Sequence, residues 1–150
     1  MNTCFDVANY FLKTQDTEAG DLMTNMKLQK LVYYAQGFYL AMTDTPLFNE
    51  PIEAWTHGPV CVPLYYMYKE YESGAIPIPV DVNANILFDE KQHEVLDLVH
   101  TYFGQFSAWK LRNLTHEEPT WMNAAHNRGE ITHEAMRTYF KTQLIEDDAE

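Results

Sequence analysis

The residue types best suited to catalysis lie at a Gly-Pro turn near the middle of the chain. His57 and Cys61 flank this turn, four positions apart. A thiol near the start of a helix can have a depressed pKa, and His57, His116 or His126 would supply the imidazole of a nucleophilic pair. Cys61, however, lies in the apolar run 60–62, and cysteine is among the most buried residue types. We therefore interpret Cys61 as a structural thiol, with a small hydrolase as the minor alternative.

Metal binding and acid–base catalysis find little support. The chain has six histidines and two cysteines, but neither an HExxH nor a CxxC pattern. Glu117 and Glu118 are adjacent and would point apart on a helix, so beside Pro119 they fit a helix terminus better than a catalytic pair. Thr115 and Glu118 have the spacing of a capping box, and Trp121 is expected to pack back on the preceding helix. We expect no catalytic residue, no metal and no cofactor.

The net charge limits the partners. The 150 residues carry a formal charge of -12, which repels phosphate backbones, and the ten Lys and Arg residues are scattered along the sequence. Direct nucleic-acid binding is therefore not expected, whereas the encounter with a basic protein would be accelerated. No apolar run approaches the roughly 20 residues that cross a bilayer. Two cysteines and no secretory leader at the N-terminus indicate a cytoplasmic protein.

Hydrophobic spacing predicts a mainly α, compact single domain over residues 1–150, a bundle of about six helices with a small β-hairpin. Segment 47–48 is expected to pair with 52–55, and a helix is expected from Pro59 to Ser73. Residues 75–86 should be extended or irregular, and the acidic tail 146–150 should be frayed. The ten tyrosines fit an aromatic core better than a sticky surface. The other helices should begin near Thr3, Thr24, Asp89, Ser107, Pro119 and Thr132.

Three blocks of the sequence resemble the Panacea domain, a family of SocA-like and GepA-like antitoxins and phage-associated proteins. Residues 26–37 read MKLQKLVYYAQG, and a second block joins PLF at 46–48 to IEAWTHGPV at 52–60. A third block has Leu111, LTH at 114–116, Pro119 and Trp121, and continues through Ile131 to the last helix. In this chain Thr120 stands between Pro119 and Trp121, which relatives often place closer together.

The resemblance implies a compact, mostly helical domain that acts as the antitoxin of a type II toxin–antitoxin system and neutralises a protein toxin by direct binding. An adaptor that delivers the bound toxin to a protease, such as a cytoplasmic AAA+ enzyme, is the implied alternative. A chain of 150 residues is expected to hold no added DNA-binding segment. We expect the partner surface to be formed or stabilised by Lys30, Tyr33, Tyr34, Trp55, His57, Gly58, Pro59, His116 and Trp121.

Overall fold

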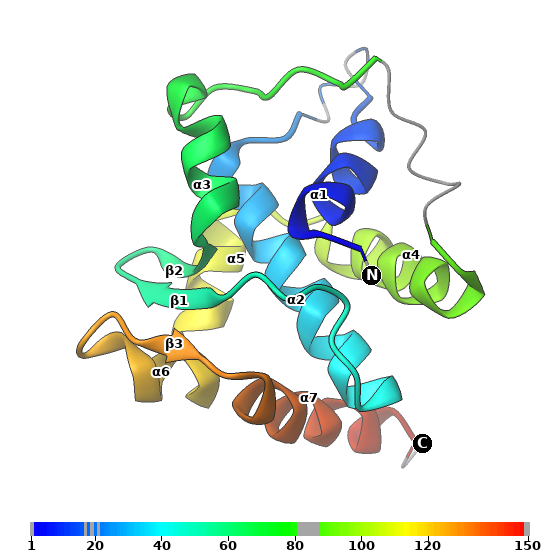
Figure 1. The fold of residues 1–150 in the computed structure, drawn as a ribbon. Helices are drawn as coiled ribbons and strands as arrows, with labels where there is room; N and C mark the ends of the chain where they lie inside the picture. The colour runs from blue at the N-terminus through cyan, green and yellow to red at the C-terminus, as the bar shows by residue number, and fades with distance from the viewer. Residues whose placement is uncertain (1, 17, 19, 21, 81–87, 149–150) are drawn as a thin grey trace.

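The computed structural model describes residues 2–16, 18, 20, 22–80 and 88–148. Within these ranges the chain forms seven α-helices and one three-stranded antiparallel sheet (Figure 1), which confirms the predicted mainly α class. The elements in chain order are α1 (Cys4–Lys13), α2 (Asn25–Thr43), β1 (Ile52–Trp55), β2 (Gly58–Cys61), α3 (Val62–Tyr68), a 3-10 turn (Lys69–Tyr71), α4 (Glu90–Phe103), α5 (Ala108–His116), α6 (Pro119–Ala125), β3 (Glu130–Ile131) and α7 (His133–Asp148).

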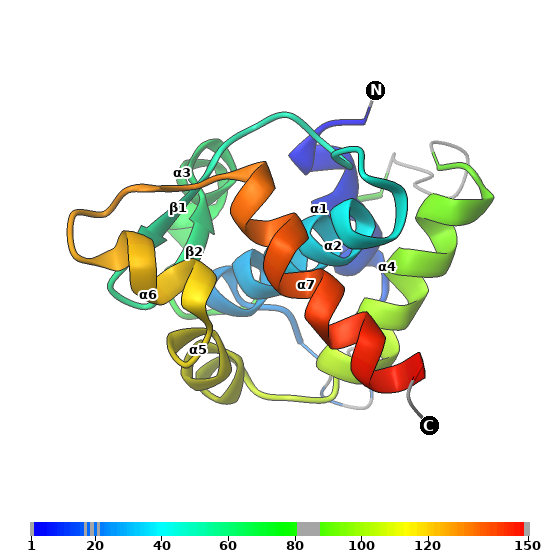
Figure 2. The same cartoon turned by 90° about the horizontal axis from the view of Figure 1, so that it is seen from below.

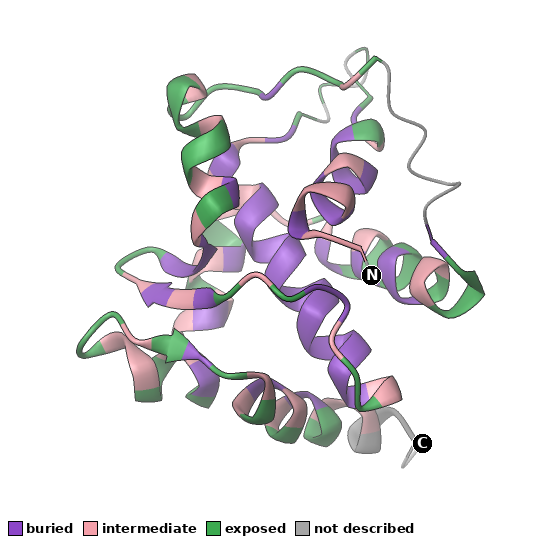
Figure 3. Cartoon of the chain, in the orientation of Figure 1, coloured by how far each residue is buried: buried purple, intermediate pink, exposed green. Residues whose placement is uncertain are grey.

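Helix α2 is the centre of the fold. Helices α1, α3, α4, α5 and α7 and strand β2 all pack against it, and Figure 2 shows α7 lying across it. Every residue from 28 to 41 is buried, as the unbroken purple of this helix shows in Figure 3. A helix enclosed on all sides must bury its polar side chains as well, and each of those needs a hydrogen-bonding partner.

Buried glutamine side chains on α2 form hydrogen bonds with backbone groups that are not bonded within the sheet. The Oε1 atom of Gln36 accepts from the Leu47 amide at 2.7 Å, and its Nε2 donates to the Phe48 carbonyl at 2.7 Å. The Oε1 atom of Gln29 accepts from the Cys61 amide at 2.9 Å, along the outer edge of β2. The predicted pairing of 47–48 with β1 is therefore wrong, because Gln36 satisfies the backbone groups of that segment.

Strand β1 pairs instead with β2, from Ile52 opposite Cys61 to Trp55 opposite Gly58, and β3 joins its other side. The predicted helix start at Pro59 is wrong, since Pro59 belongs to β2 and α3 begins at Val62. The Pro59 carbonyl points away from β1, so the missing amide of this proline costs no hydrogen bond of the ladder. Strands β1 and β2 therefore pair with each other across one tight turn.

Most helix boundaries follow the predicted caps. Thr3, Thr24, Asp89 and Ser107 each accept a hydrogen bond from the backbone amide three residues ahead. Helix α3 ends at Tyr68, before the predicted Ser73, and α7 continues through residue 148 into the predicted tail. Residues 76–80 are irregular as expected, while residues 81–86 of the same prediction and residues 149–150 of the tail lie outside the described ranges.

Candidate partner-binding cleft

A cleft of about 740 Å³ opens between the start of α2, the β1–β2 turn, α3 and the start of α5. We name it the Trp cleft, after Trp55 and Trp109 on its walls. Tyr65 adds a third aromatic ring, and Lys69 and Arg128 bring cations to it. Its volume falls within the roughly 300–1,000 Å³ of typical ligand-binding sites.

The walls of the Trp cleft are aromatic rings held by cations. Trp109 remains 55% exposed although Arg112 lies over its ring at 4.6 Å. The Trp55 ring meets Tyr65 edge-on at 5.0 Å, and Arg128 lies over Trp55 at 4.6 Å. Such cation–π contacts fix the rings at small entropic cost, and exposed tryptophan and arginine side chains are the types enriched at interaction hot spots.

Lys30 lies beneath the same cleft. The residue is only 1% exposed, and its Nζ donates to the Pro59 carbonyl at 3.2 Å. The ion pairs found among the described residues do not include Lys30. Burial, together with repulsion from Arg112, lowers the pKa of Lys30 to about 7. At neutral pH this buried amine is therefore only partly protonated, and none of the described carboxylates forms an ion pair with it.

Gly58 is required because Lys30 closes over it. Its φ of +111° lies in the range that favours glycine, and a Cβ at this position would lie 2.7 Å from Cε of Lys30 and 2.8 Å from Oγ1 of Thr115. The sequence Thr-His-Gly-Pro therefore places an exposed imidazole, His57, at the tip of the turn. The bare backbone of Gly58 lies directly below it, against α2 and α5.

Trp121 joins two corners of the fold, the β1–β2 corner at Gly58 and the α5–α6 corner at Pro119. The ring of Trp121 stacks on His116 at 3.8 Å between centroids and 12° between planes, which confirms that it packs on the preceding helix. Its Nε1 also donates to the Trp55 carbonyl at 2.8 Å, which ties α6 to β1. Burial and the cation of Arg112 lower the pKa of His116. The two corners therefore form one rigid support behind the Trp cleft.

Glu118 lies at the start of α6, as predicted, but its side chain does not cap a helix. Its carboxylate accepts from the hydroxyls of Tyr33 at 2.6 Å and Tyr34 at 2.8 Å, and Thr120 lies 2.6 Å from the Tyr33 hydroxyl. The hydroxyl of Thr115 donates to the Arg112 carbonyl, so the predicted capping box is wrong. Burial raises the pKa of Glu118 to about 7. No local pattern in the sequence pointed to two tyrosines some 85 positions away.

The structure divides the predicted site residues into two groups. Trp55, His57 and Lys30 line the Trp cleft. The others lie around or beneath it: Tyr33, Tyr34, Gly58 and Pro59 are buried, and His116 and Trp121 are partly buried. The sequence analysis did not single out several other residues of the cleft, because they belong to separate segments that meet only in the fold. They include Tyr65, Lys69, Trp109 and Arg128.

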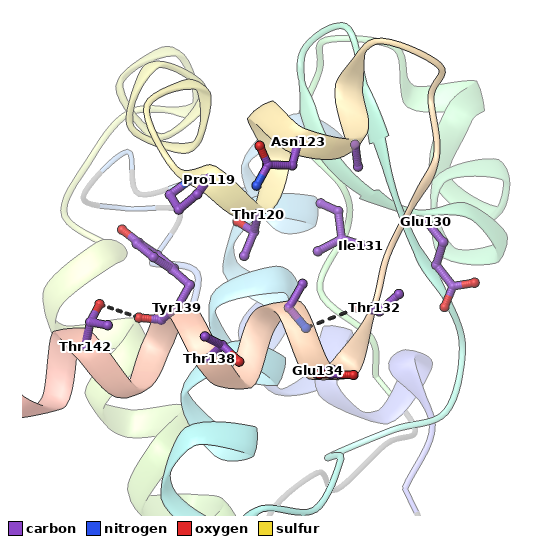
Figure 4. Close-up of a pocket in the computed structure, with 12 residues that line it drawn as sticks. Pro119, Thr120, Asn123, Glu130, Ile131, Thr132, Glu134, Thr138, Tyr139 and Thr142 are labelled. Carbon is purple, nitrogen blue, oxygen red and sulfur yellow. Dashed lines mark hydrogen bonds between the residues drawn. The ribbon is translucent and has the colours of Figure 1, made fainter.

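A second hollow, of about 760 Å³, lies between α6, β3 and α7 (Figure 4). Glu130 and Glu134 are exposed along it, and threonines from α6 and α7 supply hydroxyls, including Thr120. Figure 4 shows that these side chains come from α6, β3 and α7 and from the residues between them. The residues that line this hollow include no lysine, arginine or histidine, so its charge is opposite to that of the Trp cleft.

The structure does not assemble the pair required by the hydrolase alternative. Cys61 is buried against Cys4, and the hydrogen bond between the two thiols, together with burial, raises the pKa of Cys4. His57 is exposed at the turn, with its ring 6.2 Å from that of Trp109. Among the residues that the structure describes, no three His, Cys, Asp or Glu side chains are grouped to hold a metal. No helix in the same part of the chain is long and apolar enough to span a membrane.

Comparison with known proteins identifies the family. The family model described as Antitoxin SocA-like, Panacea domain, matches residues 28–122, which is more than half of the chain. Antitoxin SocA of Caulobacter vibrioides is 31% identical over an alignment of 103 residues. The alignment covers 63% of this chain and 55% of that protein. The chain thus spans about half the length of this relative, and no solved structure matches it. The matched residues include both corners and most of the Trp cleft, and the chain therefore belongs to the SocA-like antitoxin family with a Panacea domain.

Proposed function

We propose that this protein is the antitoxin of a type II toxin–antitoxin system and neutralises a protein toxin by binding it at the Trp cleft. The observation that carries the proposal is the convergence of the first two motif blocks on one cleft, with Trp109 half exposed at its wall. The relative named Antitoxin SocA supports the same role. Large aromatic rings already fixed in place can bind a partner without a large ordering cost.

Neutralisation of this kind requires a stable surface and no reactive group, so we infer that the protein is not an enzyme. The formal charge of -12 would accelerate the encounter with a basic toxin through long-range attraction. The aromatic and cationic Trp cleft would then select the bound orientation by close contact. Charge thus favours encounter, and the cleft supplies specificity.

Co-expression with the product of the adjacent gene tests the proposal. We expect that product to arrest growth alone and the wild-type chain to relieve the arrest. Trp109→Ala should weaken toxin binding at least about tenfold, as expected for an aromatic hot spot. Tyr102→Ala is the matched control, because Tyr102 is 56% exposed on α4 and does not line the cleft.

Two outcomes would refute parts of this proposal. A neighbour that is harmless alone, or whose toxicity the wild-type chain does not relieve, would refute the antitoxin role. Equal binding by the Trp109 and Tyr102 variants would refute the cleft as the contact site. Toxin loss that occurs only in cells with an intact AAA+ protease would favour the adaptor alternative over plain sequestration.

A further inference from the structure

The Trp cleft carries positive charge, whereas the molecule as a whole is negative. The whole chain has 22 acidic residues against ten Lys and Arg, yet the lining of the cleft includes Lys30, Lys69 and Arg128 and only one acid, Glu72. Arg112 adds a fourth cation behind Trp109. A local positive region on an acidic protein opposes the long-range field and therefore calls for a specific explanation.

Burial of Lys30 makes the positive charge of the cleft energetically unfavourable. Buried cations in proteins are ordinarily paired with a carboxylate, because desolvation disfavours an isolated charge. The ammonium of Lys30 has three N–H donors, and the described residues give it one carbonyl acceptor and a repelling neighbour, Arg112. In the free protein the charged form of Lys30 is thus disfavoured, and a carboxylate brought to the cleft would favour that charged form.

We propose that the Trp cleft receives an Asp or Glu side chain of the toxin, whose carboxylate compensates the exposed charges of Lys69 and Arg128 above the buried Lys30. This inference rests on the proposed function and adds the chemistry of the contact. The apolar part of the incoming segment packs between the rings of Trp55 and Trp109. A toxin of basic overall charge would carry one acidic anchor at its interface, so the two partners complement each other in both signs.

The overall charge selects this occupant over a nucleic acid. Every phosphate of a polyanion beyond the cleft would meet the surface of a chain with charge -12, whereas a single carboxylate meets only the local cations. The acidic hollow between α6 and α7 would repel a polyanion as well. The cleft therefore suits one localised negative group on a partner of opposite net charge.

Two double variants with equal net charge separate local from global electrostatics. Lys69→Glu with Arg128→Glu reverses the cleft, and Lys13→Glu with Lys91→Glu reverses two exposed cations that do not line it. Each replacement changes the charge by -2, so both double variants go from -12 to -16. Binding of the purified adjacent-gene product is measured by calorimetry, after circular dichroism and thermal unfolding show that each variant is folded.

We expect the cleft variant to bind at least about tenfold more weakly and the control to bind as tightly as wild type or more tightly. Lys30→Met should also weaken binding about tenfold without lowering the unfolding temperature, because replacing an unpaired buried charge with an apolar side chain does not cost stability. Zero-length carbodiimide cross-linking should join Lys69 to an Asp or Glu side chain of the toxin. A cross-link to the terminal carboxylate of the toxin would overturn the assignment to a side chain.

The same binding measurements distinguish failure of the proposed function from failure of the carboxylate inference. If the wild-type chain does not bind the adjacent-gene product, the proposed function fails and this inference fails with it. If wild type binds and the cleft variant binds as tightly as the control, only the carboxylate inference is overturned. Wild-type binding to a labelled 20-nucleotide single-stranded RNA that the cleft variant loses would overturn it as well, by assigning the cleft to nucleic acid.

Discussion

Replacing Gly58 with alanine should destabilise the protein more than the same replacement at Gly20. Both glycines have positive φ, +111° at Gly58 and +76° at Gly20. The surroundings differ, because a Cβ at Gly20 would meet nothing within 4 Å, whereas one at Gly58 would lie 2.7 Å from Lys30 and 2.8 Å from Thr115. The pair of variants therefore separates backbone strain from crowding.

The magnitudes follow from two separate costs. Positive φ costs an alanine about 1–2 kcal/mol at Gly20, and at least as much at Gly58, whose φ lies further from the left-handed helical region. Crowding a packed site costs about 1–3 kcal/mol more, and only Gly58 is crowded. We therefore expect Gly58→Ala to lower the free energy of unfolding by about 2–5 kcal/mol and Gly20→Ala by about 1–2 kcal/mol.

Urea unfolding followed by tryptophan fluorescence provides the measurement, with one m-value shared by wild type and both variants. Thermal unfolding provides a check, since each kcal/mol shifts the midpoint by about 2–4 °C in a domain of this size. If the two variants differ by less than about 0.5 kcal/mol, the close packing of Lys30 and Thr115 over Gly58 is refuted.

Three further predictions concern buried polar groups. The pKa of Glu118 in the folded protein is raised to about 7. Its contribution to the free energy of unfolding is therefore complete below about pH 4.5 and is lost as the pH rises to 7. The expected loss is about 3 kcal/mol, and Glu118→Gln should remove it in urea unfolding measured from about pH 4.5 to 7.5. If the free energy of unfolding of this variant falls with pH as steeply as that of wild type, the raised pKa of Glu118 is contradicted. Because the folded pKa of Lys30 is lowered to about 7, stability should rise between pH 7 and about 10, and a Lys30→Met variant that retains this rise would assign it to another group. Gln36→Leu removes the bonds to Leu47 and Phe48, and should lower the free energy of unfolding by about 2–4 kcal/mol in urea, whereas a loss under 1 kcal/mol would argue against this role.

Local sequence signals were sufficient for most helix starts. A helix cap is decided within four residues, so Thr3, Thr24, Asp89 and Ser107 were identified before any packing was known. The motif blocks likewise identified the family, because they are contiguous runs. The same local reasoning misplaced the hairpin, since strand pairing depends on which backbone groups are still free once α2 is in place.

Sequence periodicity alone does not place the polar residues of α2. Spacing of three and four residues marks one apolar face and leaves the other face to water. In the fold, α2 is enclosed on every side, so Gln29, Lys30 and Gln36 face the backbone of distant segments. The backbone groups that these three side chains bond lie 11 to 32 positions away along the chain. No local pattern encodes such contacts.

The sequence by itself determined the helical class, most helix starts, the glycine corner and the family. Only the tertiary structure decided that Trp109, Lys69 and Arg128 join Trp55 around one cleft, and that Glu118 lies between two tyrosines. The physical reason is that caps and periodicity depend on neighbours along the chain, whereas burial and charge pairing depend on neighbours in space. Scattered cations on an acidic chain become a binding site only when the fold brings them together.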